Sequence, residues 1–331
     1  MNKRDRLENS LAGNAVDRVP VVLWRHWPGD DQRIADFAWS TLMFQKTFDW
    51  DFVKATPYSA YSVADYGVRT EWRGDVGGDR LATKLPITRS LAWTELKTLD
   101  PLRGEQGKYL EALRLIGDGL RELDVPVMAT IYSPLSQAAM LSGDEMMLSH
   151  IRTRPDRLRT ALNTITESTL RFIDAMKRTD VVGIVYVIRH ASFSLMSEDE
   201  YRAMGASYDL KILEMLPTSW WLNIVQLRCR KPMFQLAATY PVPVMNWDAS
   251  AAEPALENAR AFCGGALCGG LSHEVHLHRG TPAMIRDVAR EMFEHMGTRR
   301  FILSAGDAVP VSTPLSNLRA VREVAEEMRA G

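Results

Sequence analysis

The amino-acid sequence predicts an α/β fold, a (β/α)₈ or TIM barrel formed by a single domain over residues 1–331, with a short N-terminal helix and a small insertion after the second strand. Eight short apolar runs alternate with amphipathic segments, and each run is too short to be a buried helix. Repeated strand–loop–helix units imply parallel strands. The first run continues into Trp24-Arg25-His26-Trp27-Pro28, which lacks the glycine fingerprint of an open dinucleotide-binding sheet.

The elements are expected in a regular order along the chain. A leading helix at residues 2–12 ends at Gly13, and the strands are expected at 19–24, 51–56, 125–132, 182–188, 222–227, 242–246, 266–271 and 301–304. Further helices are expected at 35–48, 109–123, 134–142, 155–177 and 197–216. The glycine-rich segment 67–90 is expected to form a loop or a small hairpin insertion.

Capping signals mark the start of three of the helices. Ser197 and Glu200 form a capping-box pattern, in which each side chain would bind a backbone N–H group at the helix start. Thr281-Pro282 and Thr313-Pro314 each place a capping hydroxyl before a proline at the first helical position. These signals place helices after the last two strands, as a barrel requires.

Composition excludes several classes of function. Apolar residues make up 46% of the chain and charged residues 24%, as in an ordinary globular protein. The net charge of −1 provides no field to attract nucleic acid or an anionic membrane. The longest apolar run, residues 181–188, is too short to cross a bilayer, and the charged N-terminal segment lacks an apolar signal region. We therefore expect a cytoplasmic protein without a disulfide framework, in which an exposed apolar helix face would permit a homodimer.

Polar side chains follow most of the predicted strands, at the ends that would meet at one mouth of the barrel. Arg25, Arg189 and Arg228 follow three different strands, and guanidinium groups bind carboxylates and phosphates through paired hydrogen bonds. We therefore predict that the ligand is a small anionic metabolite. His190 and Asp307 also follow strands, and one or the other would deliver or take the proton. The remaining residues predicted to bind the ligand are His26, Tyr132, Gln226, Asn246 and Asp248, with Trp24 and Trp247 as flat apolar walls.

The same residues also allow a structural explanation. Arg25 could pair with Asp248 or Asp307 across the barrel, Arg189 could extend to solvent, and large tryptophan side chains more often belong to the core. The stretch 273–278 contains three histidines, but their spacing fits no reliable metal-ligand pattern. We expect a solvated loop there, no metal site and no cofactor.

Several further motifs are spread along the whole chain. They are Arg6 with Asp17-Arg18-Val19-Pro20-Val21 and Trp24-Arg25; Asn246-Trp247-Asp248; Gly269-Gly270-Leu271; Arg279-Gly280-Thr281-Pro282; and Gly306-Asp307 with Pro310, Thr313-Pro314 and Asn317-Leu318. Together these stretches resemble the motifs of the uroporphyrinogen decarboxylase superfamily. The resemblance implies a (β/α)₈ barrel with its active site at the carboxyl mouth, in a superfamily that also contains zinc-dependent corrinoid-linked methyltransferases.

Departures from the family pattern narrow the expected activity. Of the decarboxylase site residues, only Arg25 carries over to this chain by the resemblance. The family's aspartate, for example, falls near Thr56 and is missing here. We therefore do not expect uroporphyrinogen itself as the substrate. The zinc ligands of the methyltransferase branch correspond to Gln226, Arg228 and Asp307, and a guanidinium cannot ligate a metal. We expect the arginine and the aspartate to face each other in the metal's place.

The leading prediction is a metal-independent lyase of the decarboxylase type that acts on a small acidic molecule. Arg25, Asp307 and His190 would be catalytic, while Arg189 and Arg228 would hold the acidic groups of the substrate. One alternative is a methyl- or alkyltransferase with an altered metal site, using the stretch 273–278. The other alternative is a barrel that binds an anionic metabolite without turnover.

Overall fold

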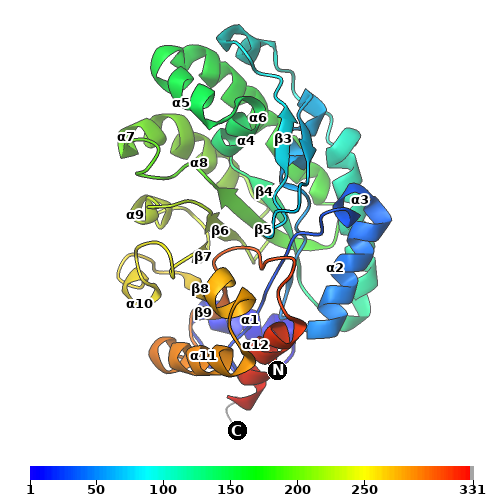
Figure 1. The fold of residues 1–331 in the computed structure, drawn as a ribbon, viewed down its shortest axis with the longest axis vertical. Helices are drawn as coiled ribbons and strands as arrows, with labels where there is room; N and C mark the ends of the chain where they lie inside the picture. The colour runs from blue at the N-terminus through cyan, green and yellow to red at the C-terminus, as the bar shows by residue number, and fades with distance from the viewer. Residues whose placement is uncertain (329–331) are drawn as a thin grey trace.

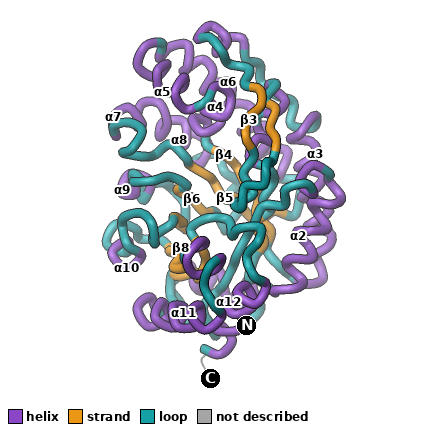
Figure 2. Tube along the Cα trace, in the orientation of Figure 1, coloured by secondary structure: helices purple, strands orange, loops and turns teal. Residues whose placement is uncertain are grey.

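The computed structural model describes residues 1–328, which form a curved, fully parallel sheet surrounded by helices (Figures 1 and 2). The sheet has seven strands in the order β1-β4-β5-β6-β7-β8-β9. Because every connection between neighbouring strands passes through at least one helix, all the carboxyl ends point to the same side of the sheet. The strands are β1 (Val53–Lys54), β4 (Val127–Tyr132), β5 (Val181–Ile188), β6 (Ile224–Leu227), β7 (Val244–Trp247), β8 (Ala266–Leu271) and β9 (Phe301–Ala305).

The helices form a ring around the strands in Figure 1, from α2 and α3 through α5 and α6 to α11 and α12. Within residues 1–328, no helix combines the length and apolar character needed to span a membrane. The helices are α1 (Lys3–Ala12), α2 (Ile34–Phe48), α3 (Gly104–Leu120), α4 (Pro134–Ser142), α5 (Asp144–Thr153), α6 (Pro155–Met176), α7 (Glu198–Tyr201), α8 (Ser207–Leu213), α9 (Phe234–Ala237), α10 (Leu256–Ala259), α11 (Pro282–Met296) and α12 (Leu315–Glu327).

The segment 19–24, predicted as the first strand, is extended but makes only a single parallel bridge, between Val21 and Leu303 of β9. On that side Val22 N–H donates to Leu303 O at 3.1 Å, and on the other side the backbone N–H of Asp51 donates to Val21 O at 3.0 Å. The N–H of Val21 donates instead to the Asp51 carboxylate, at 2.7 Å. Since a side chain takes this backbone donor, the segment joins the two edges of the sheet without becoming an eighth regular strand.

Two arginines hold Asp51 in place beneath this segment. Arg6 and Arg18 each contact a different oxygen of the Asp51 carboxylate at 2.7 Å, and all three side chains are almost fully buried. Arg18 also donates to Glu326 of α12 at 2.8 Å. A buried carboxylate is tolerable only when paired and hydrogen-bonded in this way. The opening motif that carries the family resemblance is therefore structural and fixes the first segment of the barrel.

Two of the three predicted capping signals act as expected. Ser197 and Glu200 form both hydrogen bonds of a capping box, and Thr281 accepts from Met284 N–H at the start of α11. The third prediction was wrong, because Pro314 is the N-cap of α12 and the helix begins at Leu315. The helix predicted at 197–216 is divided into α7, a π-helical turn (Arg202–Ala206) and α8.

The segment between β1 and α3 contains an antiparallel pair, β2 (Arg69–Glu71) and β3 (Leu81–Lys84). The residues between these strands, 72–80, are called the hairpin loop below, and in Figure 1 this hairpin crosses in front of the sheet. Val311 N–H donates to Val76 O at 2.7 Å. At Gly78, where φ is +83°, an added Cβ would lie 2.5 Å from Cβ of His26. The hairpin loop therefore packs directly on residues that follow the strands.

Candidate functional site

Arg228, which follows β6, is the centre of a polar cluster at the carboxyl ends of the strands. Its Nε donates to Asp307 Oδ2 at 2.6 Å. Its two terminal nitrogens donate to the two carboxylate oxygens of Asp79 at 3.0 and 2.7 Å. One guanidinium thus binds a carboxylate that follows β9 and a second carboxylate from the hairpin loop, the latter in the paired geometry typical of arginine. The predicted facing of Arg228 and Asp307 is found.

The charges of this cluster stabilise one another. Burial opposes the charge of Arg228, but Asp307 and Asp79 outweigh it and raise the pKa of the guanidinium well above its usual value. Burial also opposes ionisation of the two carboxyl groups, while Arg228 lowers the pKa of Asp307 and brings the pKa of Asp79 to about 2. Both carboxylates are therefore ionised at neutral pH, and Asp307 can accept a proton but has none to donate.

A buried lysine lies in the same cluster. Lys54, at the end of β1, donates from Nζ to Gln226 Oε1 at 2.7 Å and stands over the Trp24 ring, 4.6 Å from its centroid. The Gln226 amide donates in turn to Gly306 O at 3.1 Å, which fixes its orientation. Burial lowers the pKa of Lys54 to about 7, although Asp307 opposes the shift. Within residues 1–328 no carboxylate is hydrogen-bonded to this amine.

Two further cations have no hydrogen-bonded carboxylate in the part of the chain that the structure describes. Arg25 donates to Val311 O at 2.6 Å and stacks 4.7 Å from the Trp27 ring centroid, while its buried Nε has no hydrogen-bond partner in the described chain. Burial lowers the pKa of Arg25. Arg189 acts on Asp79 electrostatically, lowering that residue's pKa, but hydrogen-bonds no carboxylate among residues 1–328. Of the three predicted arginines, Arg189 and Arg228 thus face the same carboxylate, and Arg25 is held beside the hairpin loop.

His26 and Tyr132 are buried against this cluster. Burial, followed by the charge of Arg228, lowers the pKa of His26 to about 4, so its imidazole is neutral at pH 7. Burial raises the pKa of Tyr132 to about 12 despite the opposing charges of Arg228 and Arg189. Both are neutral hydrogen-bonding groups in a positively charged setting.

His190 is directed to a different set of partners. Its Nε2 lies 3.1 Å from Asp144 Oδ1 at the start of α5, and its Nδ1 lies 3.4 Å from Ser136 Oγ. The hydrogen bond from His190 lowers the pKa of Asp144. The imidazole thus has a partner on each ring nitrogen, and it is not hydrogen-bonded to Asp307.

The predicted residues after β7 are mostly structural. The Asn246 amide donates to Cys268 O at 2.8 Å and Ala305 O at 3.0 Å, joining β7 to β8 and β9. Trp247 is 1% exposed and packs 4.6 Å from the Phe234 ring, so it belongs to the core and is no wall of the mouth. Asp248 pairs with His273 at 3.3 Å, an arrangement that raises the pKa of the histidine. Among residues 1–328, no arginine is hydrogen-bonded to Asp248, whose side-chain partners are His273 and Ser250.

The residues present do not fit the zinc of the methyltransferase branch. At the corresponding positions Gln226 is engaged by Lys54, and Asp307 is bound to Arg228. Throughout residues 1–328, no three His, Cys, Asp or Glu side chains are placed to hold one ion. The stretch His273–His278 is a π-helical turn rather than a solvated loop, and His276 Nδ1 accepts from Ser272 N–H at 3.0 Å.

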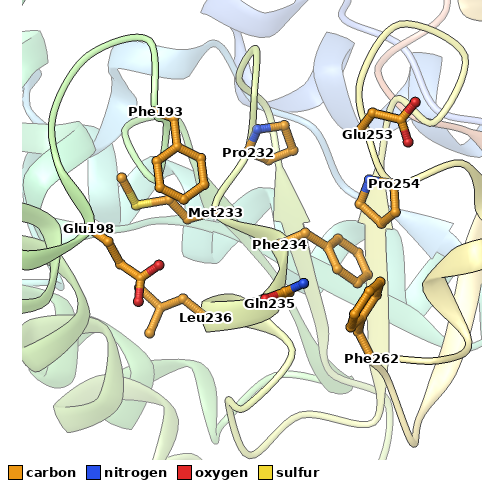
Figure 3. Close-up of a pocket in the computed structure, with 10 residues that line it drawn as sticks. All are labelled: Phe193, Glu198, Pro232, Met233, Phe234, Gln235, Leu236, Glu253, Pro254 and Phe262. Atoms are coloured by element: carbon orange, nitrogen blue, oxygen red, sulfur yellow. The ribbon is translucent and has the colours of Figure 1, made fainter.

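A separate hollow of about 300 Å³ lies outside this cluster, between the loops that follow β5, β6 and β7 (Figure 3). Its walls are mainly apolar, including Phe193, Phe234 and Phe262, and its charged side chains are Glu198 and Glu253. An anion would meet two like charges and no cation there. The cation-rich cluster around Arg228 is therefore the better candidate for an anion site.

Sequence reasoning missed Lys54 and Asp79. A lysine within the apolar strand 51–56 was a usable signal, because a lysine is almost never fully buried without a special environment. Asp79 gave no signal, since it lies in a glycine-rich insertion and meets Arg228 only through tertiary folding.

The fold and the site together define a class: parallel α/β barrels with a polar site at the carboxyl ends of their strands. The chain belongs to the uroporphyrinogen decarboxylase (URO-D) family, whose model matches residues 67–328. No curated protein matches the chain in sequence.

Solved structures show the same architecture. A methyltransferase from Methanosarcina mazei has 20% identity and a TM-score of 0.85, with 99% of each chain covered. A B12-independent methionine synthase from Shewanella sp. W3-18-1, solved with selenomethionine, has 11% identity and a TM-score of 0.58, with 94% of each chain covered. At these identities the likeness establishes the fold alone.

Proposed function

We propose that this protein is a metal-independent lyase of the decarboxylase type, acting in the cytoplasm on a small molecule that carries carboxylate or phosphate groups. One observation carries the proposal: Arg25, Lys54 and Arg189 are buried or half-buried and have no hydrogen-bonded carboxylate within residues 1–328. Removing a charge from water without a partner is costly. Binding an anion at this mouth would offset that cost.

The contact between Arg228 and Asp79 suggests where one acidic group of the substrate binds. Asp79 is 42% exposed at its side chain, whereas Arg228 is 17% exposed. A substrate carboxylate that approaches from solvent would make the same paired hydrogen bonds to Arg228 and displace Asp79. Asp307 would continue to hold Nε of the guanidinium, so the arginine would keep its orientation when the hairpin loop leaves.

The same cations suit the departure of carbon dioxide. As the carbon–carbon bond breaks, its electron pair remains on the substrate, and positive groups fixed nearby stabilise that charge without reorganising. We assign this role to Arg25 and Arg189. The carbanion then takes a proton from solvent, while the ionised Asp307 orients Arg228. His190 orients the end of β5 through Asp144 in this scheme.

Two measurements test the proposal. Calorimetric titration shows which di- and tricarboxylates and phosphate monoesters bind, and an assay then measures carbon dioxide release from those that do. We expect Arg228→Ala to weaken binding by about 100-fold, as expected when a hydrogen-bonded charge pair loses one partner. The exposed Arg299→Ala is the matched control and should bind as the wild type does. Equal affinity of Arg228→Ala and wild type, or no anion bound by the wild type, would refute the anion site.

A methyl- or alkyltransferase is the second candidate, favoured by the structural likeness to the methyltransferase of Methanosarcina mazei. This function requires metal-binding residues other than Gln226, Arg228 and Asp307, so stoichiometric zinc in the purified protein would support it. Tight anion binding without any turnover would instead favour a binding protein.

A further inference from the structure

The ε-amine of Lys54 has an environment unlike that of an ordinary buried lysine. A buried ammonium normally pairs with a carboxylate, but here Nζ contacts a neutral amide oxygen at 2.7 Å and an aromatic face at 4.6 Å. Because the Gln226 amide donates to Gly306 O, its oxygen is the end that faces Lys54. The amine is thus positioned by the protein without being neutralised as an ion pair.

The surroundings of Lys54 favour the uncharged amine. The residue is 8% exposed, and the permanent charge of Arg228 opposes a second positive charge beside it. With its pKa near 7, a large share of the amine carries a free lone pair at neutral pH. Desolvation and a neighbouring cation are the two means by which proteins activate a lysine as a nucleophile.

We propose that Lys54 is a catalytic nucleophile that forms a Schiff base with the carbonyl group of a small 3-oxo carboxylate. This inference rests on the proposed function, because it names the kind of acid that the cation-rich mouth takes. Arg228 and Arg189 both act on the Asp79 carboxylate. In the complex they hold the acidic end of the substrate in its place, and the carbonyl carbon then meets Nζ.

The chemistry balances without any oxidant or reductant. Nζ attacks the carbonyl carbon, and an amine proton moves to oxygen. The resulting carbinolamine takes up one proton from solvent and loses one water, which leaves an iminium ion. The bond to the carboxylate carbon breaks, carbon dioxide leaves, and the electron pair moves to the iminium nitrogen, which gives an enamine. The enamine carbon takes a proton from solvent, and water hydrolyses the resulting iminium ion. A ketone one carbon shorter is released, and the Lys54 amine is restored as one proton returns to solvent.

Borohydride trapping tests this step on the wild-type chain. The protein is incubated at pH 7 with acetoacetate, oxaloacetate or 3-oxoglutarate, reduced, and analysed by intact mass and peptide mapping. We expect one reduced adduct on Lys54, formed about tenfold or more faster than on the exposed Lys97, because only the neutral amine attacks. No adduct with any of the three acids, or equal labelling of Lys54 and Lys97, would overturn the proposal.

Two variants distinguish loss of the reactive amine from loss of the folded structure. Lys54→Arg keeps a cation and removes the reactive amine, so it should retain anion binding and lose trapping. Lys97→Met should behave as the wild type in both measurements. If Lys54→Arg fails to fold, mapping of the wild-type adduct still decides the matter.

The proposed anion site and the Schiff base fail in distinguishable ways. Succinate has two carboxylates and no ketone group for an amine to condense with, so its binding reports the anion site alone. Succinate binding without trapping of any oxo acid would refute the role of Lys54 and leave the anion site in place. Absence of binding by succinate and by every oxo acid would refute both.

Discussion

Replacing Lys54 with methionine should change how stability depends on pH. Methionine has a similar unbranched side chain and cannot be charged. The pKa of Lys54 falls from 10.5 to about 7 in the folded protein because of burial, so between these values the unfolded chain binds more protons than the folded one. By proton linkage, the free energy of unfolding of the wild type therefore rises with pH above 7 and is nearly flat below it.

The size of this effect follows from the two pKa values. At 1.36 kcal/mol per pKa unit, Lys54 adds about 2 kcal/mol to stability between pH 7 and 9, and less than about 0.5 kcal/mol between pH 5 and 7. Of its charged and titratable neighbours, Arg228 and Asp307 keep their charges in this range, and burial raises the pKa of the Cys268 thiol to about 12. The neighbours therefore contribute little to the difference.

Urea unfolding of wild type and Lys54→Met at pH 5, 7 and 9 measures this difference directly. The wild type should gain stability relative to the variant between pH 7 and 9 only, and Lys97→Met should follow the wild type. Parallel profiles for wild type and Lys54→Met would show that the amine is charged in the folded protein at neutral pH, and the argument for an activated nucleophile would fail.

Three other substitutions test the structure elsewhere. Arg228→Met removes the guanidinium that is hydrogen-bonded to both Asp307 and Asp79 and should cost about 3 kcal/mol in urea unfolding at pH 7. A loss below about 0.5 kcal/mol would contradict the cluster. Gly306→Ala places a Cβ 2.2 Å from Cα of Asp248 and should cost about 2–3 kcal/mol, whereas Gly264→Ala, with open space around it, should be neutral in the same assay. Burial raises the pKa of Asp209 from 3.8 to about 6 although three tyrosines oppose the shift, so its protonated form favours folding and that stability is lost as pH rises through 6. From pH 5 to 7 the wild type should therefore lose about 1 kcal/mol relative to Asp209→Asn, and a constant difference would contradict a pKa near 6 for Asp209.

Much of the fold could be predicted from local pattern. The apolar runs that became β5 and β8 are buried on both faces, and their boundaries agree with the predicted ones within one residue. The segment 19–24 has the same composition but not the same pairing. Its backbone donor at Val21 is bound by the Asp51 carboxylate, which two arginines fix in place, and no local pattern contains that information.

In the candidate site too, local sequence pattern predicts some features, while others depend on tertiary contacts. Arg228 and Asp307 each follow a strand, so strand assignment alone brings them to one mouth. Trp247 also ends a strand, yet its ring turns outward to Phe234, because the side chains of a strand alternate between the two faces. Asp79 and His190 depend on the hairpin loop and on α5, whose positions are set by packing over long sequence separations. Prediction from sequence therefore brought Arg228 and Asp307 together but could not assign the other partners around them.

The closure of the sheet through segment 19–24 constrains how the chain can fold during synthesis. The bridge between Val21 and Leu303 joins residues from near the two ends of the chain, so no closed ring can exist until Leu303 has left the ribosome. Until then the growing sheet has two unpaired edges that can bind other strands. A chain that stops before β9 would therefore give an aggregation-prone open sheet and not a smaller barrel.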